Sequence, residues 1–362
     1  MIFLPINKWI NDFQGPLVVG GPCSAESEIQ LMDTCKEIAK DKRVQILRAG
    51  IWKPRTRPGA FEGVGEEGLK WFKNVKEETG LKISCEVANA GHVELALKHG
   101  VDVLWIGART TVNPFSVQEI ADSLRGVDIP IMVKNPINPD LALWCGSIER
   151  LYNAGLNKIV AIHRGFATHE KTKYRNAPIW EIPIELKRKY PELPIISDPS
   201  HIAGNRDYLF HICQKALDLD FDGWMIESHN NPSEALSDPA QQVTPKNLRA
   251  LLDNLELRSD SAADEVFDSN LEELRRKIDR IDTELIDILK ARFEISKAIG
   301  NEKKLNGVTA LQVGRMDAMI NNRIQRGTKI GLEEEFMNEI YHVIHNESVR
   351  IQAHIMNDSN KK

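Results

Sequence analysis

Eight short apolar segments between residues 17 and 227 constrain the fold of this chain more than any other feature. Most are continuous runs of valine, isoleucine and leucine, which is typical of parallel strands buried on both faces. The predicted strands are Leu17–Gly21, Gln45–Arg48, Lys82–Glu86, Val101–Ile106, Ile129–Lys134, Lys158–His163, Pro194–Asp198 and Gly223–Glu227. Amphipathic stretches with helical spacing separate them, as at residues 29–41 and 66–79. This alternation predicts an α/β fold built on a parallel sheet.

Eight strand–helix repeats in about 250 residues fit a (β/α)8 barrel, the TIM-barrel architecture. An open doubly wound sheet is the alternative, but it usually has fewer strands, and the sequence has no GxGxxG loop. We therefore assign residues 1–255 to a (β/α)8 barrel. Because the first strand begins by residue 17, we expect no regulatory domain ahead of the barrel.

The character of the chain changes after the barrel segment. Residues 253–270 are polar and acidic, and we place a linker at residues 256–268. Beyond it, apolar residues recur at spacings of three and four along one helix face, and further helices are predicted over residues 310–326 and 332–355. We expect residues 269–362 to form a small all-α domain that has little core of its own and dimerises.

Composition excludes several classes of protein. The net charge of −5 argues against general binding of nucleic acid or membranes. The sequence has no apolar run of about 18 residues and does not begin like a signal peptide. The five cysteines are scattered without a CxxC pair, so we expect reduced thiols and a cytoplasmic protein.

Charged residues follow the predicted strands at their carboxyl ends. In a barrel of this kind these ends meet at one face, where active sites lie. We therefore expect six cations to converge there, namely Arg48, Lys53, Arg55, Arg109, Lys134 and Arg164. Arginine grips phosphate and carboxylate groups in a bidentate manner. So many cations indicate one or two substrates that carry several negative charges.

Four further residues at the strand ends are of metal-ligating types. Cys23 lies in the GPCS string, His201 in DPSH, Glu227 at the end of the eighth strand and Asp238 in LSDPAQ. A thiolate, an imidazole and two carboxylates suit a divalent transition metal. We expect Mn²⁺, with Fe, Co and Zn as alternatives, since ligand type alone does not fix the metal.

Several strings in the barrel segment carry a resemblance to a known family. GPCS, KPRTRPGAFEG, IGART, DPSHIAG and the Glu–Asp pair of IESHNNPSEALSDPAQ resemble the short-barrel subgroup of type I 3-deoxy-D-arabino-heptulosonate 7-phosphate (DAHP) synthase. The resemblance covers residues 15–250. KPRT argues against the related 8-carbon 3-deoxy-octulosonate phosphate synthase, which has a KANRSS-like string here. The family catalyses a step of the shikimate pathway, the metal-dependent condensation of phosphoenolpyruvate with erythrose 4-phosphate.

The resemblance implies a role for each strand-end residue. Arg55 and Thr56 would hold erythrose 4-phosphate, and Lys53 would also transfer a proton. The phosphoenolpyruvate set would be Arg48, Lys53, Arg109, Lys134 and Arg164. The metal ligands would be Cys23, His201, Glu227 and Asp238.

The C-terminal segment resembles the all-helical chorismate mutase over residues 269–356, with spacings that align without a gap. The resemblance implies that Arg275 reaches the site of a partner protomer and that Arg292 and Arg315 grip the two carboxylates of chorismate. Lys303 and Gln352 would hydrogen-bond the ether oxygen, and Ser348 would bind substrate beside them. Such a rearrangement to prephenate needs no acid, base or metal.

Two positions depart from the mutase pattern. Met316 stands where the best-known members have Glu, and Gln312 where they have Asp. The leading hypothesis is a bifunctional enzyme of aromatic amino acid biosynthesis, with feedback through the mutase domain. The alternatives are a helical domain that only senses prephenate or chorismate and dimerises, and a barrel that uses arabinose 5-phosphate as its aldose.

Overall fold

The computed structural model describes residues 1–11, 13, 15–53, 59–169, 172–258 and 265–357. The chain divides into two compact units, residues 1–260 and 261–362. Each unit is described by itself below. The predicted domain limits at residues 255 and 269 stay predictions. The first helix of the second unit, α11 (Glu265–Leu305), begins within the residues predicted as a linker.

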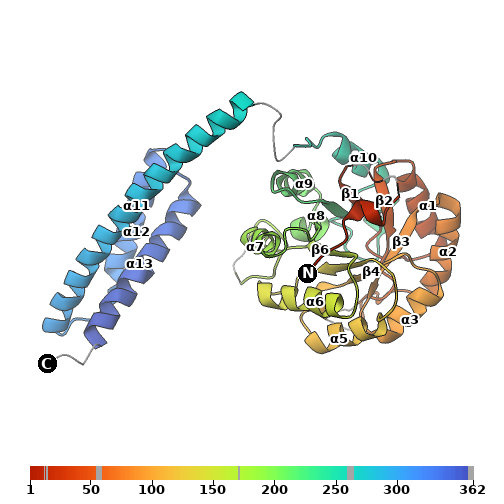
Figure 1. Cartoon of the computed structure of the whole chain (residues 1–362), viewed down its shortest axis with the longest axis horizontal. Helices are drawn as coiled ribbons and strands as arrows, with labels where there is room; N and C mark the ends of the chain where they lie inside the picture. The colour runs from red at the N-terminus through yellow and green to blue at the C-terminus, as the bar shows by residue number, and fades with distance from the viewer. Residues whose placement is uncertain (12, 14, 54–58, 170–171, 259–264, 358–362) are drawn as a thin grey trace. The chain divides into compact units, whose positions relative to one another are not determined.

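The first unit is a closed barrel of parallel strands surrounded by helices (Figure 1). Each strand pairs with the next along the chain, and β8 pairs with β1 to close the barrel. The strands are β1 (Leu17–Gly21), β2 (Val44–Arg48), β3 (Lys82–Val87), β4 (Val103–Ile106), β5 (Ile131–Lys134), β6 (Ile159–His163), β7 (Ile195–Ser197) and β8 (Gly223–Glu227). The predicted (β/α)8 fold is thereby confirmed.

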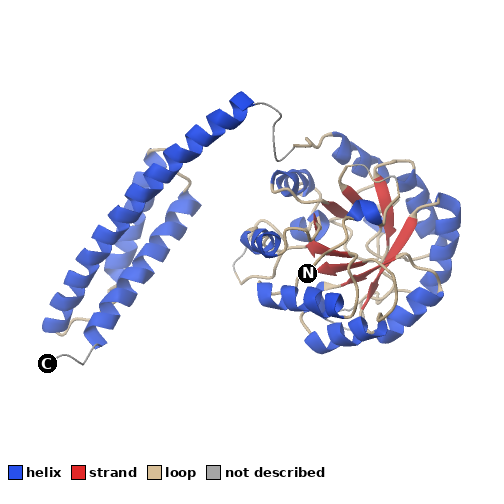
Figure 2. Ribbon diagram, viewed as in Figure 1, coloured by secondary structure: helices blue, strands red, loops and turns tan. Residues whose placement is uncertain are grey.

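Helices follow the strands and cover the outside of the barrel, as the ribbon in Figure 2 shows. They are α1 (Glu28–Ala39), α2 (Glu67–Thr79), α3 (Ala90–Lys98), α4 (Ala108–Thr111), α5 (Pro114–Ser123), α6 (Leu141–Asn153), α7 (Glu181–Lys189), α8 (Pro199–Ala203), α9 (Leu209–Asp218) and α10 (Pro245–Asp253). Polar side chains cap several of them. Ser27 accepts from the backbone of Gln30 at the start of α1, and Asp140 from that of Leu143 at the start of α6.

The barrel core consists of the apolar runs that predicted the strands. Strands β1, β4, β5, β6, β7 and β8 are buried at every residue, as expected for a sheet packed on both faces. The buried charged side chains of the strands lie at strand ends. Arg48, Lys134 and Glu227 are each at most 5% exposed at the ends of β2, β5 and β8. The fold therefore carries charged groups into a buried environment at one face of the barrel.

The second unit is a set of three helices. It consists of α11, α12 (Val313–Lys329) and α13 (Glu334–Asn357), with α13 packed against both of the others. Few of its side chains are buried, among them Ile320, Met337 and Gln352. The predicted all-α domain with a small core is confirmed.

Candidate active sites

Three potential metal ligands meet where the barrel strands end. The ligand atoms of Cys23, Glu227 and Asp238 all lie within 4.8 Å of one another. Cys23 and Glu227 are fully buried, and the Sγ atom of Cys23 lies 3.5 Å from Oδ2 of Asp238. One sulfur and several carboxylate oxygens at this spacing suit a divalent transition metal.

Strand register explains why Cys23 and Glu227 meet. β1 pairs with β8 so that Gly21 lies opposite Glu227, and Cys23 follows two residues later. Gly21 has a φ of +152°, and a Cβ atom here would clash with the backbone carbonyl of Arg48. The glycine of the GPCS string therefore serves the close approach of β1 and β2.

The fourth predicted metal ligand, His201, borders this cluster. It lies in α8, and its backbone N–H donates to Oδ1 of Asp198, which caps the helix. Its Nδ1 lies 2.8 Å from Oδ2 of Asp198, and its Nε2 lies 3.8 Å from Oε1 of Glu227. A carboxylate on one imidazole nitrogen orients the other, as is usual for metal-binding histidine.

Burial and neighbouring charges set the protonation of the ligands. Burial, and then the carboxylate of Glu227, raises the pKa of Cys23 to about 11. Lys53 opposes this shift, because its Nζ lies 3.1 Å from the Cys23 sulfur. Burial raises the pKa of Asp238, but Arg175 and His201 outweigh it and bring that pKa to about 2. The thiol keeps its proton at neutral pH unless a cation displaces it, whereas Asp238 stays ionised.

Two residues that the sequence interpretation missed hold the carboxylates in place. Nε2 of Gln241 donates to Oε2 of Glu227 at 2.7 Å. Nη1 of Arg175 donates to Oε1 of Gln241 at 2.7 Å and to Oδ1 of Asp238 at 2.9 Å. Oε1 of Glu227 accepts no hydrogen bond from the described residues, although Nη1 of Arg48 lies 3.3 Å away. This buried oxygen is therefore available to a cation.

Buried cations surround the carboxylates. The Nζ of Lys134 lies 2.7 Å from Oδ2 of Asp198, which therefore bridges Lys134 and His201. Although burial raises the pKa of Asp198, His201 and Lys134 hold it well below its usual range. Asp198 marks the DPSH string, but the sequence interpretation gave it no role in the site.

The remaining predicted cations of the barrel gather after β4 and β6. Arg109 lies exposed in α4, and Arg164 follows β6 with its Nη1 donating to Oδ1 of Asn176 at 2.8 Å. Burial lowers the pKa of Arg164 to about 10, opposed by Asp198 and reinforced by Arg175 and Arg109. Guanidinium groups this close together, in an environment that disfavours their charge, suit an anionic ligand.

The other two predicted residues of the barrel site, Arg55 and Thr56, lie outside the described residues. Lys53, from the same KPRT string, is described. Its Nζ donates to the carbonyl oxygen of Cys23 at 2.9 Å, so the lysine reaches the cluster of Cys23, Glu227 and Asp238. The barrel face thus combines a potential metal site with a group of cations, an arrangement suited to anionic substrates.

The helical unit has a cavity of about 430 Å³ between its helices. The predicted residues that line it are Arg292, Lys303, Arg315, Ser348 and Gln352, together with Gln312 and Met316. Nη1 of Arg292 donates to Oγ of Ser348 at 2.5 Å, and Nζ of Lys303 donates to the carbonyl oxygen of Ala310 at 2.6 Å. Residues from three helices thus form one cation-lined pocket.

The helical cavity also extends the predicted set. Arg275 does not line the cavity of its own chain and pairs with Glu272 on the surface of α11, at 2.7 Å, and its role at a partner's site stays a prediction. Met319, Arg323 and His345 line it but were not predicted. Met319 lies three residues after Met316, and Arg323 lies four residues after Met319, so all three share one helix face. This spacing by itself does not indicate a ligand-binding role.

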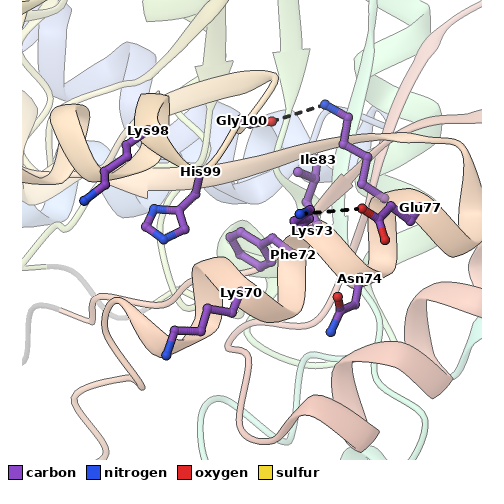
Figure 3. Close-up of a pocket in the computed structure, with 10 residues that line it drawn as sticks. Lys70, Phe72, Lys73, Asn74, Glu77, Ile83, Lys98, His99 and Gly100 are labelled. Atoms are coloured by element: carbon purple, nitrogen blue, oxygen red, sulfur yellow. Dashed lines mark hydrogen bonds and ion pairs between the residues drawn. The ribbon is translucent and has the colours of Figure 1, made fainter.

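A larger cavity, of about 680 Å³, lies between α2 and the segment around α3 and β3 (Figure 3). Several of its lysines already have acidic partners. Lys70 pairs with Glu67, and Lys73 with Glu77. Figure 3 shows Lys70, Lys73 and Glu77 on one helix, and none of the potential metal ligands lines this cavity. Size alone therefore does not make this cavity the active site.

Potential metal ligands beside buried cations, at the strand ends of a (β/α)8 barrel, are typical of an enzyme that acts on anionic substrates. The family model of the DAHP synthetase I family matches residues 11–261, and that of chorismate mutase type II matches residues 274–353. The chain belongs to the DAHP synthetase I family. It joins a DAHP synthase domain, a transferase, to a chorismate mutase domain, an isomerase.

Relatives with known names support this assignment. The chain is 30% identical over 244 residues to a phospho-2-dehydro-3-deoxyheptonate aldolase of Thermotoga maritima, covering 67% of this chain and 70% of the relative. The crystal structure of a DAHP synthase from Thermotoga maritima matches with a TM-score of 0.61 and 27% identity, over 67% of this chain and 70% of that one. A 2-dehydro-3-deoxyphosphooctonate aldolase of Polaromonas naphthalenivorans is 26% identical, over 66% of this chain and 88% of the relative. In the part of the chain that the structure describes, no helix is long and apolar enough to span a membrane.

Proposed function

We propose that the barrel condenses phosphoenolpyruvate with erythrose 4-phosphate to give DAHP and phosphate, in a reaction that needs a divalent metal. The observation that carries the proposal is the cluster of Cys23, Glu227 and Asp238 beside buried cations. Oε1 of Glu227 accepts no hydrogen bond from the described residues, and His201 directs its Nε2 toward this oxygen. Both observations fit a metal ion bound between these side chains. When bound, such a metal supplies Lewis-acid polarisation of the aldehyde carbonyl. Mn²⁺ is our first choice of metal, with Fe, Co and Zn as alternatives.

The cations have a separate task in this proposal. Arg48, Lys134 and Arg164 would hold phosphoenolpyruvate together with Lys53 and Arg109, so that two anionic substrates approach each other without repulsion. Arg55 and Thr56 would hold the phosphate end of erythrose 4-phosphate. Lys53 would also move a proton, since its Nζ lies within hydrogen-bond distance of the Cys23 thiol. Because KPRT argues against the 8-carbon chemistry, we propose erythrose 4-phosphate as the aldose and not arabinose 5-phosphate.

We propose that the helical domain rearranges chorismate to prephenate. Arg292 and Arg315 would grip the carboxylates, Ser348 would bind substrate beside them, and Lys303 and Gln352 would donate to the ether oxygen as the C–O bond breaks. The side-chain Oε1 of Gln352 is buried without a partner among the described residues, which leaves this amide free to reorient toward a ligand. Met316 in the same cavity favours the alternative of a sensor that binds without turnover.

The variant Arg292→Ala helps to distinguish a helical domain that catalyses the rearrangement from one that only binds its ligand. For an enzyme, we expect the rate of chorismate consumption to fall about 10²–10³-fold, since a preorganised charged donor is lost. Chorismate absorbance measures this rate, and Lys290→Ala on the same helix is the exposed control. A wild-type chain that binds prephenate but converts no chorismate would establish the sensor instead.

We further propose that the protein is a homodimer through the helical domain. The predicted apolar face of α11 is exposed in the single chain, with Leu274, Ile278, Ile281, Leu285 and Ile288 between 46% and 64% exposed. An exposed apolar stripe of this length marks an interaction surface. Dimerisation would also give Arg275 a partner site to reach. Ile281→Asp combined with Ile288→Asp should yield monomers in sedimentation equilibrium, whereas the exposed control Lys290→Asp should not.

Prephenate or chorismate would serve as the feedback signal from the helical domain to the barrel. Such coupling requires a ligand that binds two global states with different affinity. The decisive experiment follows phosphoenolpyruvate consumption with erythrose 4-phosphate and Mn²⁺, with and without prephenate. Slower consumption in the presence of prephenate supports feedback. Consumption that prephenate does not change means that the helical domain does not regulate the barrel. No consumption in either case contradicts the proposed barrel reaction. Five buried free thiols agree with our proposal of a cytoplasmic protein.

A further inference from the structure

The cavity of the helical domain is unbalanced in charge. Arg292, Lys303, Arg315 and Arg323 all line it, and no aspartate or glutamate does so among the described residues. None of these four cations forms an ion pair with a carboxylate in the part of the chain that the structure describes. Such a cavity is complementary to a ligand that brings its own negative charges.

Arg323 extends the cation set by two turns of α12. Gln312, Met316, Met319 and Arg323 follow one another at spacings of four, three and four, so they share one helix face. All four line the cavity. Burial lowers the pKa of Arg292, Tyr341 opposes this shift, and Arg323 adds to it, so Arg323 lies near Arg292. Two guanidinium groups therefore face the same space from different helices.

His345 faces that space from α13. It precedes Ser348 by three residues and Gln352 by seven, and all three line the cavity. Its Nε2 is buried and has no hydrogen-bond partner among the described residues. Around the imidazole lie Arg292 and Lys303 from α11 and His342 from its own helix, with Arg315 and Arg323 of α12 on the cavity wall. No acidic group among these neighbours balances the charge.

We propose that Arg323 and His345 are ligand-contacting residues of this cavity and that, with Arg292, they receive one carboxylate of a dicarboxylate ligand. The inference rests on the proposed function of the helical domain and adds two residues to it. A carboxylate here would accept from both guanidinium groups and from Nε2 of the imidazole, so it would supply the acidic partner that the two arginines lack and a hydrogen-bond partner for Nε2.

Protonation of His345 should then accompany binding. Burial, and then Arg292, His342 and Lys303, lowers the pKa of His345 in the free protein, so the imidazole is neutral at pH 7. A bound carboxylate would raise that pKa, because an opposite charge favours the imidazolium. Binding should therefore take up protons and strengthen as the pH falls from 8 to 6.

Calorimetric titration of the full-length chain with prephenate tests the inference, and chorismate turnover is measured in parallel. We expect Arg323→Met to raise Kd about tenfold or more, since a hydrogen bond between charged groups is lost. Arg323→Lys should recover part of the affinity. Arg326→Met removes the same charge from an exposed position one turn along α12 and should leave Kd unchanged. Titrations in two buffers of different ionisation enthalpy measure proton uptake, which His345→Gln should abolish and the exposed control His354→Gln should keep.

The outcomes separate this inference from the proposed reaction. Weakened binding in Arg323→Met and loss of proton uptake in His345→Gln support it, whether or not the wild type turns chorismate over. Wild-type affinity in Arg323→Met, or unchanged proton uptake in His345→Gln, overturns it even if turnover is normal. A wild type that binds but does not convert chorismate contradicts only the mutase reaction.

Discussion

The barrel face and the helical cavity both gather cations, but they differ in how those cations are balanced by carboxylates. At the barrel face several charged groups have counter-charges within the protein, as Lys134 has Asp198 and Asp238 has Arg175. In the helical cavity the described lining holds cations and no carboxylate. The barrel site is therefore assembled before substrate arrives, whereas the helical cavity depends on its ligand for charge balance.

This difference reflects how each unit is held together. The barrel buries Arg48, Glu227 and Asp198 almost completely, and a buried charge without a partner would be very costly. The cations of the helical cavity are less buried, so water screens their mutual repulsion until a ligand enters. The comparison predicts that mutations at the barrel face affect stability as well as activity, and that those in the cavity affect mainly binding.

The largest effect should come from Cys23→Ala, which tests whether the two sites are independent. We expect loss of the condensation by about 10³-fold or more, because the proposed metal ligand and its contact with Lys53 disappear. Chorismate turnover should stay within about twofold of wild type, since no cavity residue changes. Parallel assays of phosphoenolpyruvate and chorismate consumption measure this, and loss of both in a folded variant would contradict separate sites.

Asp198→Asn should next reveal the cost of unbalancing the barrel face. The carboxylate bridges Lys134 and His201, so its neutralisation leaves a buried ammonium without a partner. We expect the free energy of unfolding to fall by about 3–5 kcal/mol. All seven tryptophans lie before residue 225, so tryptophan fluorescence during urea unfolding reports the barrel alone. Arg323→Met should leave that transition unmoved, and equal transitions for the wild type and Asp198→Asn would refute the contrast.

The pH dependence of barrel stability should depend on His163. Burial lowers its pKa to about 4, and its Nε2 lies 2.6 Å from the carbonyl oxygen of Pro178. Because the unfolded state takes up the proton first, stability should decline as the pH falls from about 6.5 toward 4, by a total on the order of 3 kcal/mol. His163→Phe, which suits the ring contacts with Trp180 and Phe221, should flatten this decline in urea titrations at several pH values. If the stability of the variant declined equally steeply with falling pH, groups other than His163 would be responsible.

The smallest effect should come from the cavity between α2 and the segment around α3 and β3. Lys73 in that cavity is 72% exposed on its side chain, and its Nζ lies 3.9 Å from Oε1 of Glu77. Because exposed ion pairs contribute little, Lys73→Met should change the free energy of unfolding by no more than about 0.5 kcal/mol. Neither activity should change. A clear loss of condensation would mean that this surface takes part in function after all.

Much of the barrel followed from the sequence because its signals are local. Continuous apolar runs predicted every strand to within two residues at either end, as with β1 and β8, whose predicted and observed limits coincide. The strand-end positions of Cys23 and Glu227 followed from the same pattern, since parallel strands in a barrel point their carboxyl ends to one face.

The sequence by itself determined the two units, the strand order and the residue types at the strand ends, because periodicity and turn chemistry act over a few residues. Only the tertiary structure decided which groups became partners. Gln241 on Glu227, Arg175 on Asp238, and Arg323 and His345 in the helical cavity belong to ordinary surface residue types, and nothing local marks them as buried or facing a site. The physical reason is that hydrogen bonds and charge balance depend on distances between segments far apart in the chain, which residue spacing alone does not encode.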